Sequence, residues 1–285
     1  MSSSSSSSLA FANNDRIAVV TGSNKGIGYY IALQLASSGL FRNVILGCRD
    51  SIRGANAAQE LQAKCENKQT EISFLPLTIG NKVSHTTFKQ AIEDKFGKVD
   101  VLVNNAAMAF KGSDPTPFQE QCKPTLDVNF FGTVDFTNEM LPLIRKSNND
   151  PRIVNVASQT GYLDQLRSME LKKKFLSCNM EELYDLIHQF KLDVSNGVHL
   201  ERGWGNSNYG CSKLALIAAT KVLARTEARY GIKVNCCCPG YCDTDMTSHK
   251  GPRHPNDGAK NAVLPATMEN CPTGEFFKNG KVVNW

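Results

Sequence analysis

The alternation of short apolar runs with helical stretches constrains the fold of this 285-residue chain more than any other feature. Continuous apolar strands joined by helices are typical of a parallel sheet buried on both faces, and right-handed crossovers make such a sheet doubly wound. The sequence therefore predicts a single α/β domain with a doubly wound parallel sheet and helices on both faces. The strand-type runs are 17–20, 44–46, 72–75, 99–103 and 153–156. The first helical stretch follows the first strand and ends near 38, and the next three cover 53–66, 83–96 and 118–141.

The predicted domain covers residues 15–285. Residues 1–14 form a Ser-rich N-terminus that we expect to be disordered, because seven serines follow Met1. Within the domain, the alternation stops at 159–206, which indicates a helical insertion. We expect two short amphipathic helices there, at 169–177 and 180–192, followed by a helix at 207–230, a strand at 233–238, a helix at 256–268 and a last strand near 276–277.

Composition and charge exclude several classes of protein. The formal net charge is only +5, and the longest basic run, 172–174, indicates a solvated helix face rather than a nucleic-acid surface. No stretch approaches 18 apolar residues and the N-terminus has no secretory pattern, so neither a membrane span nor export is expected. The ten cysteines include no Cys-x-x-Cys pair, which indicates free thiols in the cytoplasm, no metal site, and a packing role for the run 236–238.

A glycine-rich turn joins the first strand to the first helix, with the sequence Thr21-Gly22-Ser23-Asn24-Lys25-Gly26-Ile27-Gly28. Glycines let a backbone approach a pyrophosphate closely, and the helix N-terminus supplies free N–H groups and the positive end of a dipole. At the first strand–helix junction, such a turn predicts a dinucleotide site and makes the sheet Rossmann-type. The residues expected to contact the cofactor here are Gly22, Asn24, Lys25, Gly26, Ile27 and Gly28.

The end of the second strand predicts which dinucleotide binds. Arg49 stands where an NAD site usually has a carboxylate, and a guanidinium can hold a 2′-phosphate through two hydrogen bonds. Lys25 in the glycine turn supplies a second cation, while Asp50 comes one residue later and is expected to point away. We therefore expect NADPH as the cofactor. The alternative is that Arg49 and Lys25 are two solvated surface cations.

Tyr209 and Lys213 are four residues apart, so a helix places both on one face. A phenol has a pKa near ~10 and a neighbouring ammonium lowers it, so Tyr209 is expected to act as a general acid near neutral pH. Ser158 ends the fifth strand, at the edge where ligands bind in open α/β sheets. Its hydroxyl is expected to donate to a substrate oxygen, although a strand-end cap is the simpler interpretation of this serine alone.

Taken together, these residues resemble the short-chain dehydrogenase/reductase family from about residue 15 to the C-terminus. The family's Asn-Asn-Ala-Gly motif matches 104–107 and its Pro-Gly motif matches 239–240. The resemblance implies a catalytic tetrad of Asn129, Ser158, Tyr209 and Lys213, in which the backbone of the asparagine holds a water linked to the lysine. It also implies cofactor contacts from Asn105, Tyr209, Lys213, Pro239, Gly240, Cys242 and Thr244, with the lysine at the ribose and Thr244 at the nicotinamide.

Within the family, the chain most resembles the monomeric NADPH-dependent carbonyl reductases, over 104–118, 197–204, 234–246 and the final Trp285. In that subgroup the insertion covers a helix face that other members use to form tetramers, so the resemblance implies a monomer. Three residues depart from the family pattern. Ala107 replaces a glycine, Thr78 replaces an aspartate that faces the adenine, and Tyr241 replaces a tryptophan near the expected substrate pocket.

The expected function is NADPH-dependent carbonyl reduction, in which hydride passes to a ketone, aldehyde or quinone and Tyr209 supplies the proton. Two alternatives are a non-catalytic NADPH-binding sensor or scaffold, and a dehydrogenase that oxidises alcohols with NAD. The complete tetrad disfavours the first and Arg49 disfavours the second. The residues leave open the substrate, the stereochemistry of transfer, and whether Cys237, Cys238 or Cys242 is reactive.

Overall fold

A computed structural model of the chain describes residues 15–285, which form one eight-stranded sheet with the order β3-β2-β1-β4-β5-β6-β7-β8. Strands β1 to β7 run parallel, and β8 pairs antiparallel with β7. The chain starts at the centre of the sheet and extends it in both directions, which confirms the predicted Rossmann-type doubly wound class. The strands are β1 Ile17–Thr21, β2 Asn43–Cys48, β3 Glu71–Pro76, β4 Val101–Asn104, β5 Arg152–Val156, β6 Lys233–Cys238, β7 Phe276–Lys278 and β8 Lys281–Val283.

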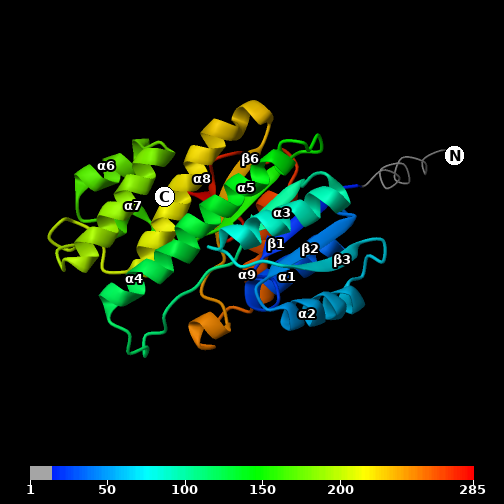
Figure 1. Cartoon of the computed structure of the whole chain (residues 1–285), viewed down its shortest axis with the longest axis horizontal. Helices are drawn as coiled ribbons and strands as arrows, with labels where there is room; N and C mark the ends of the chain where they lie inside the picture. Colours follow the sequence, from blue (N-terminus) through cyan, green and yellow to red (C-terminus); the bar gives the residue numbers. More distant parts are fainter. Residues whose placement is uncertain (1–14) are drawn as a thin grey trace.

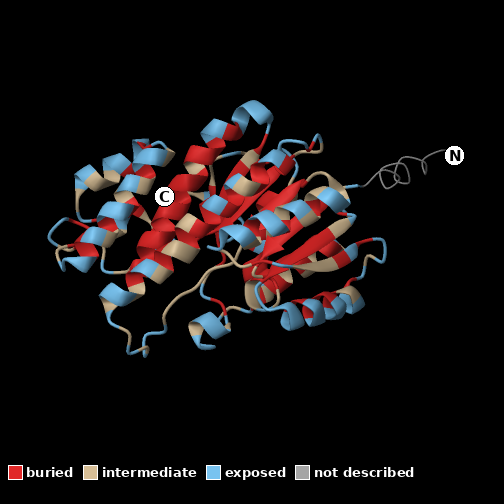
Figure 2. Cartoon of the chain, viewed as in Figure 1, coloured by how far each residue is buried: buried red, intermediate tan, exposed pale blue. Residues whose placement is uncertain are grey.

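Helices cover both faces of the sheet (Figure 1). Alternate residues of a strand point to opposite faces, so Ala18 and Val20 pack in one core while Ile17 and Val19 pack in another. The central strands are buried on both sides (Figure 2). The first core contains α1 Gly26–Ser37, α2 Ser51–Lys64 and α9 Pro255–Thr267, and the second contains α3 Lys82–Phe96, α5 Thr133–Ile144 and α8 Asn208–Glu227.

Two predictions about single elements were incomplete. The helix expected over 118–141 is divided into α4 Phe118–Leu126, a π-helical segment Asp127–Gly132, and α5. Buried residues continue at a helical spacing through all three pieces, as at Cys122, Leu126, Phe130 and Val134, so the sequence period does not reveal the π-helical segment. Strand β8 was not predicted because it is three residues long and largely exposed, and it is joined to β7 by Asn279 and Gly280 at φ 51° and 73°.

The predicted insertion contains α6 Met169–Ser177 and α7 Met180–Ser195, at the expected places. Both helices lie at one end of the molecule beside α4 and α8 (Figure 1). Buried side chains of α6 and α7, such as Phe175 and Phe190, pack with Leu126 of α4 and Leu214 of α8 in one apolar cluster. The insertion therefore extends the core of the domain rather than forming an exposed loop. Between residues 15 and 285, the structure contains no helix with both the length and the apolarity that a bilayer crossing requires.

Candidate active site

Residues far apart in the sequence gather along one edge of the sheet. The glycine turn follows β1, Arg49 follows β2, Asn105 follows β4, Ser158 follows β5 and Pro239 follows β6. Because β1, β2, β4, β5 and β6 are parallel, their carboxyl ends meet at the same edge, where open α/β sheets bind ligands. The topology thus brings the expected cofactor and catalytic residues to one region.

The glycine turn has a backbone that larger residues do not fit. Gly22 and Gly26 have φ of +64° and +58°. A Cβ on Gly28 would lie 2.4 Å from both the Asn105 side-chain nitrogen and the Gly22 carbonyl oxygen. Helix α1 begins directly here, and neither a side-chain cap nor an acidic residue occupies its first turn. Its first N–H groups are therefore available to a phosphate, which fits the expected dinucleotide.

Asn105 fixes this turn from the neighbouring strand. Its side-chain Nδ2 donates to the carbonyl oxygens of Thr21 and Gly22, both at 3.0 Å. The hydroxyl of Thr21 in turn accepts hydrogen bonds from the backbone N–H groups of Asn105 and Ala106, at 3.0 Å and 2.9 Å. Thr21 is thus a site residue that the sequence analysis did not select, although it opens the glycine motif.

The two expected phosphate cations lie in different environments. Arg49 is exposed beyond β2, beside the glycine turn, where Gly22 N–H donates to Gly47 O at 2.7 Å. Within the described part of the chain, the Arg49 guanidinium makes no hydrogen bond or ion pair. Lys25 instead pairs with Asp245, in the segment after β6. Arg49 therefore remains open to a ligand, whereas Lys25 connects the glycine turn to that segment.

Asp50, the carboxylate that follows Arg49, is held by the next helix. Its side chain caps α2 by accepting the Arg53 N–H at 2.9 Å, and it also pairs with the Arg53 guanidinium. This capping is consistent with the expectation that Asp50 does not serve the cofactor.

Tyr209 lies in the first turn of α8, with Lys213 one turn further on. Lys213 is 3% exposed. Its ammonium lies 5.5 Å from the centre of the Tyr209 ring and donates a hydrogen bond to Val156 O at 2.8 Å. Burial lowers the pKa of Lys213 to about 8. Burial also raises the pKa of Tyr209, so the expected net lowering of this pKa is wrong for this structure. The phenol is therefore protonated at neutral pH, which is the form that a proton donor needs.

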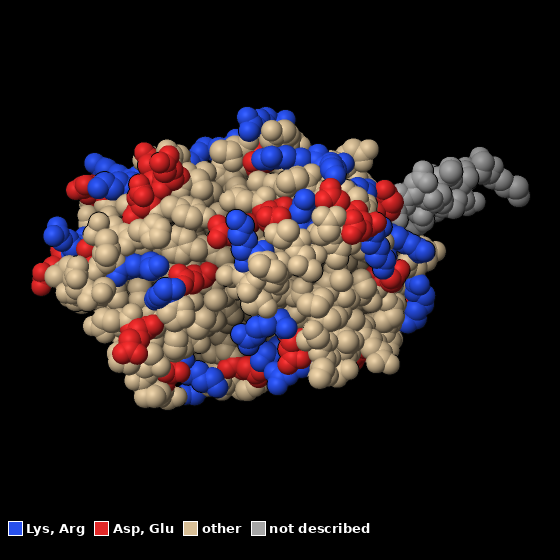
Figure 3. All heavy atoms as spheres, in the orientation of Figure 1, with Lys and Arg blue, Asp and Glu red and all other residues tan. Residues whose placement is uncertain are grey.

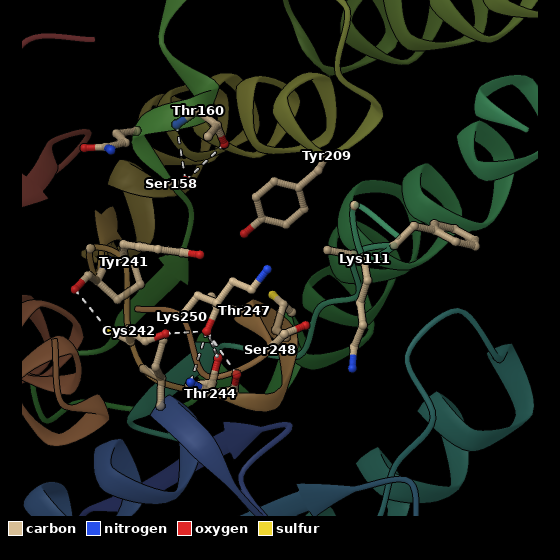
Figure 4. A pocket seen from close by; sticks show the side chains of 18 of the residues that line it. Lys111, Ser158, Thr160, Tyr209, Tyr241, Cys242, Thr244, Thr247, Ser248 and Lys250 are labelled. Atoms are coloured by element: carbon tan, nitrogen blue, oxygen red, sulfur yellow. Dashed lines mark hydrogen bonds between the residues drawn. The ribbon is translucent and has the colours of Figure 1, made fainter. Parts of the chain in front are cut away.

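Ser158 has a hydroxyl oriented by its own loop (Figure 4). Its Oγ accepts hydrogen bonds from the backbone N–H of Thr160 at 3.2 Å and from the Thr160 hydroxyl at 3.0 Å. A serine hydroxyl has two acceptor positions and one donor, so the O–H remains free to donate. The strand-end cap and the oxyanion donor are thus compatible roles for this serine.

Asn129 lies in the π-helical segment and is 1% exposed. Its side chain bonds the backbone of Met108 in both directions at 2.8 Å, and it donates to the Ser212 hydroxyl at 3.1 Å. These three bonds join the loop after β4 to the start of α8, next to Lys213. The Asn129 side chain is thus held by protein groups on two sides. Ser212 was not selected from the sequence, because its partner lies 83 residues away.

A cavity of about 610 Å³ lies at the same edge and is open to Ser158 and Tyr209 (Figure 4). Ile27 of the glycine turn and Thr244 also line it. Five expected site residues are not part of this lining: Asn24, Arg49, Asn105, Asn129 and Lys213. The lining also includes the expected cofactor residues Pro239, Gly240 and Cys242. Tyr241, which stands where related proteins have a tryptophan, lines the cavity as well.

The cysteines around the cavity are buried. All ten cysteines of the chain fall within residues 15–285, and each is a free, buried thiol. Burial raises the pKa of Cys237 and of Cys242. Thiols that resist ionisation are poor nucleophiles, so packing explains these residues, as predicted for the run 236–238.

The fold and the site together define a dinucleotide-dependent oxidoreductase of Rossmann type, with a glycine turn beside a Ser, Tyr and Lys cluster. The family model "short chain dehydrogenase" matches residues 16–169 and 193–254. This chain therefore belongs to the short-chain dehydrogenase family. The residues that the match passes over, 170–192, comprise most of α6 and α7.

Several relatives match nearly the whole chain. "Carbonyl reductase [NADPH] 1" of Mus musculus is 40% identical over 281 residues, which cover 94% of this chain and 98% of the relative. The protein of the same name in Homo sapiens is 39% identical, with coverage of 94% and 98%. Among solved structures, salutaridine reductase from Papaver somniferum superposes with a TM-score of 0.82 at 28% identity, covering 92% of this chain and 99% of that chain.

Proposed function

We propose that this chain is an NADPH-dependent carbonyl reductase, which reduces a ketone, aldehyde or quinone with Tyr209 as the proton donor. The observation that carries the proposal is that Ser158 and Tyr209 line one cavity together with Ile27 of the glycine turn and Thr244. The relatives named NADPH carbonyl reductases, at about 40% identity over almost their full length, support the same activity and cofactor.

Each part of the cofactor has a matching group in the chain. The turn 22–28 and the N-terminus of α1 would hold the pyrophosphate, and Arg49 would hold the 2′-phosphate. Lys213 would hold the ribose and Thr244 would contact the nicotinamide. When bound, NADPH supplies the hydride, and the protein supplies orientation and the proton.

The catalytic side chains act on the carbonyl oxygen. The free O–H of Ser158 and the phenol of Tyr209 donate to this oxygen, which becomes more negative as hydride arrives at the carbon. Tyr209 then transfers its proton, because an alkoxide is a far stronger base than a phenolate. Lys213 lies beside the Tyr209 ring and stabilises the phenolate that results. We propose that the backbone of Asn129 holds a water linked to Lys213, and that this relay returns a proton to Tyr209.

The test is the oxidation of NADPH and of NADH, followed by absorbance, with a quinone and with an aromatic ketone. We expect NADPH turnover by the wild type and a loss of about 10²–10⁴-fold in Tyr209→Phe, the range for a missing general acid. Tyr230→Phe is the matched control, because this tyrosine is 42% exposed at the far end of α8. Binding of NADPH without turnover of any carbonyl would instead favour a sensor or scaffold.

We further propose that the enzyme is a cytoplasmic monomer. The insertion helices α6 and α7 pack over α4 and α8 and so occupy the helix face through which other family members are expected to assemble. Ten unpaired cysteines suit a reducing compartment.

A further inference from the structure

We propose that Gln165 is a positioning residue, whose side-chain amide ties the loop that carries Ser158 to the first turn of α8 and so sets the distance between Ser158 and Tyr209. The inference rests on the proposed reductase function and adds a residue outside the expected tetrad. Gln165 ends a short 3₁₀ turn, Leu163–Gln165, at the start of the insertion. It is not among the residues that line the cavity, so it acts through other residues.

The Gln165 amide nitrogen donates to backbone carbonyl oxygens of both segments. Nε2 lies 2.8 Å from Thr160 O, in the loop after β5, and 3.1 Å from Gly210 O, in the first turn of α8. A longer contact of 3.4 Å reaches Tyr162 O. A carboxamide nitrogen carries two hydrogens, and the two shorter contacts can use both. One side chain therefore joins the two segments that carry Ser158 and Tyr209.

On one side of this link, Thr160 transmits its position to Ser158 (Figure 4). The Thr160 N–H and hydroxyl both donate to Ser158 Oγ, at 3.2 Å and 3.0 Å. The Thr160 carbonyl meanwhile accepts the hydrogen bond from Gln165. Because Thr160 is held at its carbonyl and itself holds the serine oxygen, a shift of this loop away from α8 would move Ser158 Oγ with it.

On the other side of the link, Gln165 bonds the residue that directly follows Tyr209. The carbonyl of Gly210 accepts from Gln165, and its N–H donates to the Ser207 Oγ that caps α8 at 2.9 Å. The peptide groups around Tyr209 are thus held on two sides. The start of α8 cannot slide past the Ser158 loop without breaking the bond to Gln165.

Two glycines make room for the Gln165 amide. A Cβ on Gly210 would lie 2.8 Å from Gln165 Oε1, and a Cβ on Gly205 would lie 2.9 Å from Gln165 O and 3.2 Å from Oε1. These separations are shorter than the optimum of roughly 3.5 Å for non-bonded heavy atoms. Side chains at either glycine would therefore displace the amide from the position in which it joins the two segments.

The link is also uncharged. Basic and acidic side chains are interspersed over the face of the molecule shown in Figure 3, whereas the amide of Gln165 is neutral. Negative charge develops on the substrate oxygen held by Ser158 and Tyr209 during hydride transfer. A carboxylate at position 165 would oppose that charge and would face two carbonyl oxygens without a hydrogen to donate. A neutral donor fits this position.

The first experiment replaces the amide with an apolar side chain of similar length. Gln165→Met should lower kcat for an aromatic ketone by about tenfold, the scale of one to two hydrogen bonds used for positioning. The KM for NADPH should change by less than about twofold, because the link does not involve the glycine turn or Arg49. Steady-state rates with each substrate varied give both parameters.

Gln62→Met is the matched control. Gln62 is also half-buried, and its Nε2 donates to a backbone carbonyl, Thr70 O, at 3.0 Å, but it joins α2 to the segment before β3. Both variants lose hydrogen bonds to the backbone, so both should lower Tm. Only Gln165→Met should lower kcat, and this contrast separates positioning from a general loss of stability.

A second variant keeps the shape of the side chain and removes its donor. Gln165→Glu replaces the amide with a carboxylate of nearly the same size, so we expect the chain to fold. Its kcat should fall by at least the tenfold or so expected for Gln165→Met, because an acceptor then faces the carbonyl oxygens of Thr160 and Gly210.

A double-mutant cycle tests whether Gln165 acts through the spacing of the two hydroxyls. The distance between Ser158 and Tyr209 matters only while both side chains take part in the reaction. In a Ser158→Ala background, Gln165→Met should therefore lower kcat further by less than about twofold. Such strong non-additivity is expected of residues that act as one unit.

The inference is overturned by any of three outcomes. These are an unchanged kcat in both Gln165 variants, equal losses of kcat in Gln165→Met and Gln62→Met, and a full tenfold or so loss from Gln165→Met that persists in the Ser158→Ala background. If the wild type reduced neither a quinone nor an aromatic ketone, the proposed reductase function itself would fail. That failure is seen before any variant is compared, so the two are distinguishable.

Discussion

At the scale of single residues, Lys213 illustrates a conflict between stability and function. Its ammonium is almost fully buried with one hydrogen bond, to Val156 O, and burial lowers its pKa from 10.5 to about 8. A lowered lysine pKa means that folding opposes the charged form, at a cost of about 3 kcal/mol at pH 7 for a shift of this size. The charged lysine that the proposed reaction needs is thus the form whose burial lowers the stability of the fold.

We therefore predict that Lys213→Met is inactive but more stable. The free energy of unfolding at pH 7, from urea denaturation, should rise by about 1–2 kcal/mol, since the orphaned Val156 carbonyl offsets part of the gain. Between pH 8 and the unfolded lysine pKa of about 10.4, the unfolded wild type binds more protons than the folded wild type. The free energy of unfolding of the wild type therefore rises with pH across that window, whereas that of the variant lacks this contribution. This account would be contradicted if the variant's advantage in free energy of unfolding over the wild type did not decrease from pH 7 to pH 10.

Arg49 is predicted to decide the choice of cofactor. Arg49→Gln should raise the KM for NADPH by about 10- to 100-fold, because a paired guanidinium–phosphate contact is lost, and should change the KM for NADH by less than about twofold. Initial rates with each cofactor measure both values. Arg53→Gln is the matched control, since Arg53 already pairs with Asp50. If Lys25→Gln rather than Arg49→Gln changed the preference, the cation in the glycine turn would be the phosphate ligand.

At the scale of elements, the packing of Gly28 at the start of α1 leaves no room for a side chain. We predict that Gly28→Ala lowers the free energy of unfolding by about 1–3 kcal/mol and weakens dinucleotide binding, because its Cβ would lie 2.4 Å from Asn105 Nδ2 and Gly22 O. Urea denaturation and titration of NADPH by fluorescence measure the two effects. For stability, Gly112→Ala is the control, since a Cβ there meets nothing within 4 Å.

The C-terminal Trp285 holds the loop after β5 in place. Its Nε1–H donates to Gly161 O at 2.8 Å, and the Gly161 N–H donates to Ser158 O at 2.9 Å. Gly161 also packs closely on α8, where a Cβ would lie 2.7 Å from the carbonyl carbon of Lys213. One indole N–H thus connects the end of the chain to the backbone of two proposed catalytic residues.

From these contacts we predict that Trp285→Phe lowers kcat by about three- to tenfold, the effect of losing roughly one hydrogen bond of positioning. The KM for NADPH should change little, because the glycine turn and Arg49, which are proposed to hold the phosphates, lie on other loops. Steady-state kinetics with both substrates varied separate the two parameters. A loss confined to thermal stability, with unchanged kcat, would assign Trp285 a packing role alone.

At the scale of the whole molecule, the insertion is expected to keep the chain monomeric. Its buried side chains, among them Phe175, Ile187 and Phe190, bury apolar surface of α4 and α8 that would otherwise face solvent or another subunit. Light scattering after size exclusion should therefore give a mass near 31.3 kDa for the pure protein. A mass of two or four chains at micromolar concentration would contradict the proposed monomer.

Most of the fold could be read from the sequence because it depends on local patterns. Buried strands and amphipathic helices are specified by the spacing of apolar residues, so α6, α7 and β6 were predicted at or very near their observed bounds. The π-helical segment Asp127–Gly132 and strand β8 were missed. The first preserves the helical period, and the second is stabilised mainly by pairing with β7 rather than by its own composition.

The sequence by itself determined the sheet, the glycine turn and the identity of Ser158, Tyr209 and Lys213, because each is defined by residue type and short-range spacing. Tertiary structure alone decided how these groups are charged and partnered. The pairing of Lys25 with Asp245 spans 220 residues, and the direction of the Tyr209 pKa follows from burial by the whole domain. The cavity lined by Ile27, Ser158 and Tyr209 is also assembled from distant segments. Such contacts depend on chain packing in three dimensions, which no local pattern of residues encodes.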